Sequence, residues 1–221
     1  TKLFYKELSD WYFWALKQVK FPSEPTLIQA TALGKNHEDL VKEHNATNVI
    51  RMLTRLLFVW FIKQKGLIPE ELFDEKELEN NILTELNPIK QTGMFTHTGK
   101  DSVYYKAILQ NLFFASLNCP IKPQSDDEDK RERGFRREAN YGDDFGNDWL
   151  FRYKKYFQKE YQDGKFVELI NSKVPFLNGG LFECLDDKHN KIFIDGFSDN
   201  LPKTERLIVP DYIFFGRDEN V

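Results

Sequence analysis

The stretch NATNVIRMLTRLLFVWFIKQKG, residues 45–66, is the most apolar and most regularly patterned part of the chain. Its large apolar side chains recur at spacings of three and four residues, the period of one face of an α-helix. The members of this face are Val49, Ile50, Leu53, Leu56, Leu57, Trp60 and Phe61, widened by Met52, Phe58, Val59 and Ile62. The pattern predicts a helix that is buried on most sides and forms the central strut of a helical core.

Both ends of this segment carry signals typical of helix termini. Asn45 or Thr47 is expected to cap the start, because a short side-chain oxygen accepts hydrogen bonds from the free N–H groups there. Lys63 lies in the last turn, where positive charge suits the carbonyl end. Gly66 is expected to end the helix, because glycine adopts the left-handed conformation at low cost.

The composition is that of a folded domain without a disulfide framework. Of 221 residues, 41% are apolar and 30% charged, and 20 are Phe, which favours a core filled with rings over an aromatic interface. Two cysteines, Cys119 and Cys184, indicate a reducing compartment and hence a cytoplasmic protein. The net charge of -4 counts against a free-standing nucleic-acid binder but leaves room for a local basic patch. Charged residues interrupt every candidate membrane span, so no membrane association is expected.

The remaining segments predict a mainly α protein, a multi-helix bundle with a small α+β annex at its C-terminal end. A helical core is expected over residues 1–118, with helices at 3–21, 26–33, 75–86 and 102–117 beside the central one. Residues 148–221 are expected to hold helices at 148–161 and 166–170. Short strands are expected at 191–194 and 206–209.

Residues 119–147 differ in character and predict a long mobile loop between the two parts. They contain two prolines, an acidic run at 126–129 and a basic run at 130–137 with five positively charged residues and one Glu. Phe135 lies within the basic run, and basic residues beside an aromatic ring suit a phosphate backbone. The alternative is a solvated loop in which the acidic run neutralises the basic one.

The search for catalytic motifs yields no self-contained active site. Glu128-Asp129-Lys130 matches the ExK element of metal-dependent nucleases, but it lies in a hydrophilic segment without a suitable upstream Pro-Asp pair. Pro210-Asp211 is such a pair, yet no ExK follows it. The Asn-Pro-Pro-Tyr loop of amino-methyltransferases is absent. Two histidines, His37 and His44, lie seven residues apart with no third ligand nearby, which favours solvated or capping roles over a metal pair.

Two stretches resemble a known family. The central NATNVIRMLTRLLFVWFIKQKGLIPEELF, with the preceding FYKELSDWYFWALKQVKFP, is similar to the helical region of fused restriction endonuclease–methyltransferases, the type IIG or type IIS enzymes. The segment VPFLNGGLFECLD resembles the stretch that these proteins carry shortly before their adenine-specific methyltransferase core. Because the chain begins at Thr1 without methionine, we expect a fragment of a longer protein.

The resemblance implies a helical connector plus the lead-in to a methyltransferase domain. Its partners would be double-stranded DNA and the nuclease and methyltransferase domains of the same polypeptide. The parent would use Mg²⁺ to cut DNA and S-adenosylmethionine to methylate adenine N6. Neither the nuclease triad nor the cofactor motifs occur within this chain, so no catalytic residue and no cofactor is expected in it.

Contacts with the DNA backbone are the chemistry that remains for such a connector, since phosphate contacts position a protein without reading sequence. Arg51 and Arg55, one turn apart on the central helix, could face either DNA or a buried acid. The other candidates are Lys130, Arg131, Arg133, Arg136, Arg137, Arg152, Lys154 and Lys155. The family-like turn Asn178-Gly179-Gly180 is the only glycine pair in the chain. The competing hypothesis is a structural or protein-interaction domain without DNA contact, and scattered rather than continuous basic charge would favour it.

Overall fold

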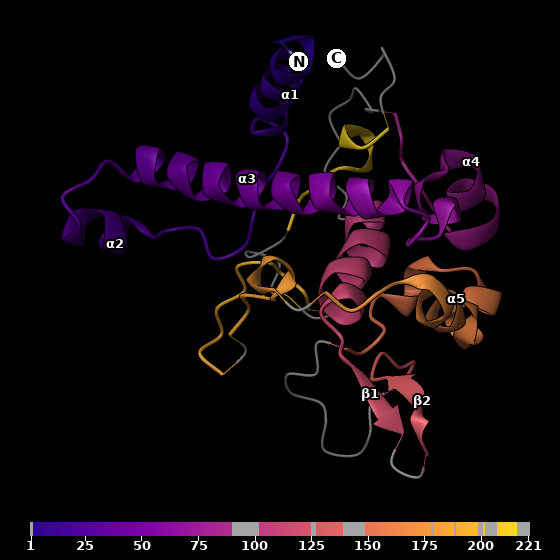
Figure 1. Cartoon of the computed structure of the whole chain (residues 1–221). Coiled ribbons are helices and arrows are strands. Elements are labelled where there is room, and N and C mark those ends of the chain that lie inside the picture. The colour runs from indigo at the N-terminus through magenta and orange to yellow at the C-terminus, as the bar shows by residue number, and fades with distance from the viewer. Residues whose placement is uncertain are drawn as a thin grey trace.

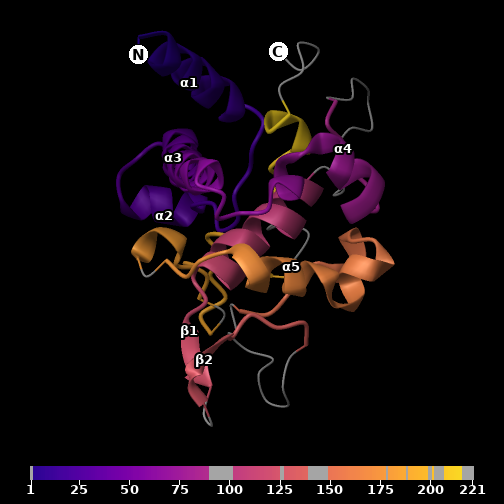
Figure 2. The same ribbon diagram turned by 45° about the vertical axis from the view of Figure 1, so that its right-hand side comes forward.

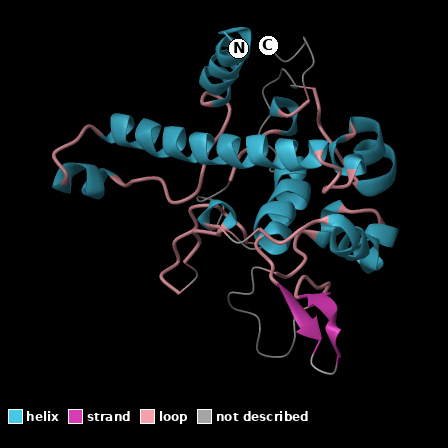
Figure 3. Cartoon of the chain, viewed as in Figure 1, coloured by secondary structure: helices cyan, strands magenta, loops and turns pink. Residues whose placement is uncertain are grey.

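The computed structural model describes residues 2–89, 102–124, 127–138, 149–177, 179–187, 189–198, 201 and 207–215. These residues form a mainly helical protein, in which helices dominate and one short strand pair lies apart from them (Figure 3). The prediction of a mainly α fold is therefore confirmed. Within the described residues, no helix combines the length and the apolar character needed to cross a membrane.

The central strut exists as α3, His37–Gln64, which runs across the molecule between α1, Lys2–Ala15, and the helices beneath it (Figure 1). It begins eight residues before the predicted segment, and Asn36 caps it by accepting hydrogen bonds from the next backbone N–H groups. The prediction that Asn45 or Thr47 caps the helix is wrong. Asn45 instead accepts a hydrogen bond from the Phe21 backbone N–H at 3.1 Å. The apolar period begins later than the helix, because the first two turns of α3 carry mostly polar side chains.

The far end of α3 follows the prediction. Gly66 adopts a φ of +71° directly after the last turn, which contains Lys63. A short 3₁₀ turn, Glu70–Phe73, leads into α4, Glu75–Glu77, and its π-helical continuation, Leu78–Ile82. Before the start of α3, the short helix α2 spans Leu27–Ala32 and is capped by Thr26 in a capping box with Gln29.

One face of α3 is exposed, and the prediction that this helix is buried on most sides is wrong. Its buried face contains Asn48, Val49, Met52, Arg55, Val59 and Ile62. Large apolar side chains cover the opposite face, and Trp60 is 60% exposed. The others on that face are Ile50, Leu57 and Phe61, whereas Phe58, at its edge, packs against the Phe182 ring at 5.8 Å between ring centroids. The sequence shows that apolar residues occupy most of the helix circumference. It does not show which of them pack against the rest of the protein and which stay exposed.

The innermost helix is the π-type helix η3, Tyr104–Leu117, in which every residue except Lys106 is buried. It lies beneath α3 and crosses its direction, as the two views in Figures 1 and 2 show. The carboxylate of Asp211 accepts a hydrogen bond from the Tyr104 backbone N–H at 2.8 Å. A carboxylate from a distant segment therefore satisfies a free donor at the start of this helix.

Aromatic rings fill the space around η3, in agreement with the core expected from the many phenylalanines. Phe114 lies 5.3 Å from Phe197, between ring centroids. Phe157 lies 4.8 Å from Phe166 at the start of α5, Phe166–Lys173. Such ring pairs add to the free energy gained by burying apolar surface.

The predicted loop over residues 119–147 is wrong in its first half. Strands β1, Ile121–Gln124, and β2, Asp127–Arg133, pair in antiparallel orientation with Ile121 opposite Arg133. This hairpin extends from the lower end of η3 (Figure 1). Charged residues hid the strands, because a hairpin that projects into solvent needs no alternating apolar pattern. Residues 139–148 lie outside the described part of the chain.

The C-terminal predictions are correct only in part. Helix α5 confirms the one expected at 166–170, but residues 149–158 form loops and a 3₁₀ turn, Lys154–Tyr156, instead of the expected helix. Tyr153 has a φ of +59°, which a continuous helix does not allow. The expected strands at 191–194 and 206–209 are reduced to single bridges, Asp187 with Ile192 and Lys20 with Ile208.

Candidate functional site

The most elaborate polar site is centred on Arg55, in the middle of the buried face of α3. Its Nη1 donates to the Asp195 carboxylate at 2.7 Å, and both side chains are almost fully buried. Its Nε donates to the Leu181 carbonyl at 2.7 Å and its Nη2 to the Glu183 carbonyl at 3.0 Å. The guanidinium carbon lies 4.8 Å from the centre of the Phe114 ring. Arg55 therefore faces a buried acid rather than DNA.

The second acid of this site, Asp186, holds the backbone turn that carries Asp195. Its carboxylate accepts hydrogen bonds from the backbone N–H groups of Asp195, Gly196 and Phe197 at 2.7, 3.0 and 2.6 Å. Burial, and then the charge of Asp195, raise the pKa of Asp186 to about 6. The other oxygen of Asp195 accepts from the Leu185 backbone N–H at 2.8 Å. The carboxylates thus fix the segment to which Arg55 is bonded.

The Arg55 site is poorly suited to binding a metal ion. Within the part of the chain that the structure describes, one group of three potential ligands occurs, Cys184, Asp186 and Asp195. The carboxylates already accept hydrogen bonds from backbone N–H groups and from the Arg55 guanidinium. The positive charge of this guanidinium would also repel a metal cation. The arrangement is that of a buried ion pair with satisfied partners.

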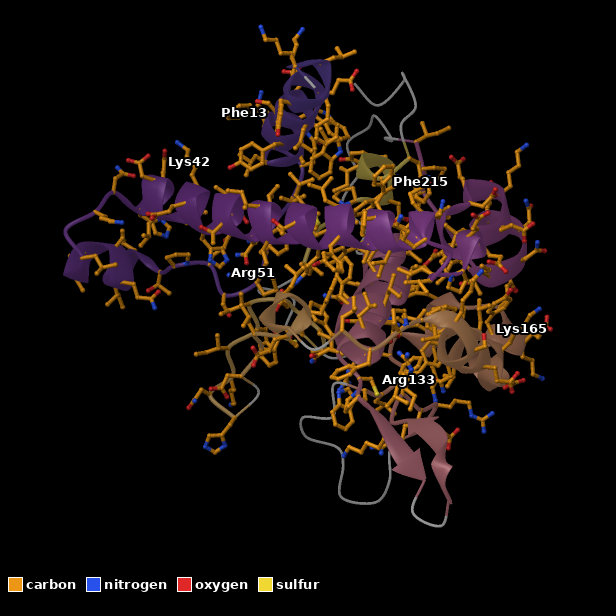
Figure 4. The ribbon with its side chains drawn as sticks, viewed as in Figure 1. Phe13, Lys42, Arg51, Arg133, Lys165 and Phe215 are labelled. Atoms are coloured by element: carbon orange, nitrogen blue, oxygen red, sulfur yellow. The ribbon has the colours of Figure 1, made fainter. Side chains whose placement is uncertain are left out.

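The basic residues around the hairpin divide between internal and surface positions. Arg133 is buried where the hairpin meets η3 (Figure 4), and it donates to the carbonyls of Ser116 and Val174. Arg137 is exposed, donates to the Asp163 carbonyl, and lies 3.5 Å from the Glu138 carboxylate. Arg136 is half-buried and donates to the Glu138 carbonyl at 3.1 Å. Arg133 is therefore not available to a phosphate.

The strand β2 also carries Lys130 and Arg131, whose side chains lie outside the described part of the structure. The three remaining candidates of the C-terminal half do not share one helix face, because the expected helix is absent. Arg152 is half-buried with its guanidinium 5.0 Å from the Phe197 ring centre. Lys154 is half-buried and Lys155 exposed, each with its amine over a neighbouring ring. Only the two lysines remain adjacent.

The last candidate, Arg51, lies one turn before Arg55 on α3 and is half-buried. Its Nη1 donates to the Asn48 side-chain oxygen at 2.7 Å. It lines a pocket of about 590 Å³ between the start of α3, the segment before α2, and residues 192–194. The structure thus separates Arg51 from Arg55, because one faces this pocket and the other the core.

The family-like turn lies beside the Arg55 site. Asn178 is outside the described residues, and Gly179 precedes a 3₁₀ turn, Gly180–Phe182. The carbonyls that Arg55 binds belong to Leu181, within this turn, and to Glu183, which follows it. The turn is therefore fastened to the central helix rather than open as a cofactor loop.

Sequence reasoning missed the acidic partners. Asp195 stands before Gly196, whose φ of +67° identifies a tight turn, and an Asp-Gly pair is the one signal that could have drawn attention to it. Asp211, considered as half of a nuclease motif, caps η3 and accepts from the Asn87 backbone N–H at 3.1 Å. A buried acid that accepts hydrogen bonds from a distant segment has no recognisable motif in the sequence around it.

Comparison with known proteins adds no family to this geometry. No protein family, no curated protein and no solved structure matches the chain.

Proposed function

We propose that this chain is the helical connector of a fused restriction endonuclease–adenine methyltransferase and that it acts chiefly as a spacer. One observation carries the proposal. The two family-like stretches, the central helix and residues 174–186, are joined by two hydrogen bonds of Arg55, to the carbonyls of Leu181 and Glu183, and its third hydrogen bond holds Asp195, nine residues beyond the second stretch. Two stretches that lie far apart in the sequence therefore belong to one packed unit, as a connector and its lead-in would.

A spacer must hold its flanking domains at a fixed distance and orientation, and the Arg55 site is suited to that task. An arginine that binds one carboxylate and two carbonyls fixes the direction of the second segment as well as its distance. The long α3 provides a straight axis, and the exposed apolar face around Trp60 provides a surface for a flanking domain of the same polypeptide. In this proposal Mg²⁺ and S-adenosylmethionine bind to the flanking domains, and the protein works in the cytoplasm on double-stranded DNA.

The full-length polypeptide offers the direct test. It should cleave DNA with Mg²⁺ and transfer methyl groups from S-adenosylmethionine to adenine. Arg55→Met in that polypeptide should broaden the distribution of cleavage positions, because it loosens the spacer, while the methyl-transfer rate changes less. Lys42→Met, an exposed change on the same helix, is the matched control. Absence of both activities would refute the proposed family, and an unchanged cleavage pattern would refute the spacer role.

A second candidate function, contact with the DNA backbone, is supported by Lys154 and Lys155. These lysines are neighbours in one 3₁₀ turn, and neither forms an ion pair within the described residues. Reversal of both charges should weaken DNA binding by the full-length polypeptide and reduce its salt dependence. Unchanged affinity across a salt series would remove them from consideration.

A further inference from the structure

The pocket beside Arg51 is a candidate binding site that the connector role does not use. It has a volume of about 590 Å³, within the range of small-molecule sites. One wall is the first half of α3, with His44, Asn48 and Arg51, and the opposite wall includes Pro25 and Ile194. Figure 4 shows Arg51 on the lower side of α3, away from Lys42 on the upper side.

Arg51 enters this pocket with an uncompensated positive charge. Its one hydrogen bond goes to the neutral side chain of Asn48, and no described carboxylate lies within ion-pair distance of it. Asn48 is 4% exposed and donates to the His44 carbonyl at 3.0 Å, so its amide is held in place. The Asn48 oxygen thereby orients the guanidinium and leaves its other N–H groups for a ligand.

The two acids at the pocket already have partners. Glu24 forms an ion pair with Lys20 at 3.1 Å, and Glu43 forms one with Lys35 at 3.0 Å. Neither acid therefore neutralises Arg51. Both would nevertheless repel a ligand with two or more negative charges, since exposed ion pairs are only partly screened.

The rest of the lining favours a ligand with an apolar body. Pro25, Leu40, Ile192 and Ile194 contribute apolar surface to the lining. A ligand that fills such a site would place its hydrocarbon part against these side chains and its charged end on Arg51. The planar fork of an arginine matches the two oxygens of a carboxylate.

We propose that this pocket binds a small organic monocarboxylate with an apolar body, held by Arg51. This inference does not depend on a role in DNA cleavage or methylation. A carboxylate carries the single negative charge that suits one free guanidinium between two paired acids. The hydrocarbon part determines which carboxylates fit, and hexanoate and benzoate are suitable probes.

The test is ligand-observed NMR on the intact chain with hexanoate and benzoate, beside their uncharged counterparts hexanol and benzamide. Both acids should bind, and the uncharged counterparts should bind at least about tenfold more weakly, because they lose the charge-assisted hydrogen bonds. Arg51→Gln should weaken acid binding by a similar factor. Lys42→Gln removes the same charge from the opposite side of α3 and should leave binding unchanged.

A second measurement on the unaltered chain keeps the test decisive if Arg51→Gln does not fold. Titration with benzoate should shift the resonances of the Arg51 side-chain N–H and the His44 ring. Absence of binding, equal binding of acid and amide, or shifts confined to another region would each overturn the proposal. Stronger Arg51-dependent binding of adenosine monophosphate or of a short DNA duplex would overturn it in favour of a phosphate site.

Discussion

Replacement of Arg55 by methionine should destabilise the chain more than the replacement of Arg51 or Arg137. Methionine preserves the length and much of the volume of the side chain but removes all three hydrogen bonds. The Asp195 carboxyl group then stays inside the core with the Leu185 N–H as a remaining donor. The carbonyls of Leu181 and Glu183 lose their arginine donors as well.

The magnitude follows from these contacts. Removing one partner of a buried ion pair costs about 3–5 kcal/mol, because the other charge stays buried. A buried acceptor left without a donor costs about 1–3 kcal/mol, but water entering at residues 181–183 would recover much of that amount. We therefore expect the free energy of unfolding to fall by about 3–5 kcal/mol. That is a large share of the about 5–15 kcal/mol typical of a domain.

Urea denaturation followed by circular dichroism measures this change. Arg137→Met, at an exposed position after the hairpin, is the matched control and should alter the free energy of unfolding by less than about 0.5 kcal/mol. The double variant Arg55→Met with Asp195→Leu should recover part of the loss, because neither charge of the pair is then left without its partner. A loss below about 1 kcal/mol in Arg55→Met would refute the reasoning, since the side chain would then be solvated.

Three further predictions concern the neighbourhood of this site and the start of η3. The pKa of Asp186 is raised from 3.8 to about 6, so the folded chain binds this proton more tightly than the unfolded chain. Its contribution to stability therefore falls as the pH rises from about 4 to about 6. Asp186→Asn should remove that slope in urea denaturation at a series of pH values, and a slope that persists would exclude this carboxyl as its source. Gly196→Ala should lower the melting temperature more than Gly34→Ala. Both glycines have φ near +65°, but only at Gly196 would the new Cβ meet another side chain, that of Pro22 at 2.9 Å. Equal shifts would show that backbone conformation alone decides the effect. Asp211→Asn should lower the free energy of unfolding by about 1–3 kcal/mol and reduce hydrogen-exchange protection at the first turn of η3. Unchanged protection there would mean that another group caps the helix.

The sequence was sufficient for the helical class and for those helices whose apolar face is packed. The end of α3 at Gly66 is predicted correctly, because it depends on local geometry, whereas the predicted buried face is wrong, since Ile50, Trp60 and Phe61 are exposed. The predicted start of α3 is too late, since its first turns carry mostly polar side chains and are held by the Asn36 cap. The hairpin β1–β2 was missed because its strands consist largely of charged residues.

The candidate sites show a different limit of sequence reasoning. The pattern indicated that Arg55 could face a buried acid, but the acid, Asp195, lies 140 positions along the chain. Arg133 looked like part of a solvent-facing basic run, yet it closes the junction between hairpin and η3. Such pairings depend on tertiary contacts, and charge patterns along the chain do not encode them.

The central claim is that the chain is a spacer whose arginines mostly form hydrogen bonds within the protein rather than with DNA. Measuring DNA binding by the chain itself tests this claim most directly. The measurement is fluorescence anisotropy of the chain titrated onto a labelled random duplex at low and moderate salt. Each phosphate contact contributes about −0.9 to the slope of log affinity against log salt concentration, so contact through Lys154 and Lys155 alone predicts a slope no steeper than about −2. No binding, or weak binding with that slope, is the expected result. Tight binding with a slope of about −5 or steeper would contradict the spacer account, because it would require many more phosphate contacts than this surface is proposed to make.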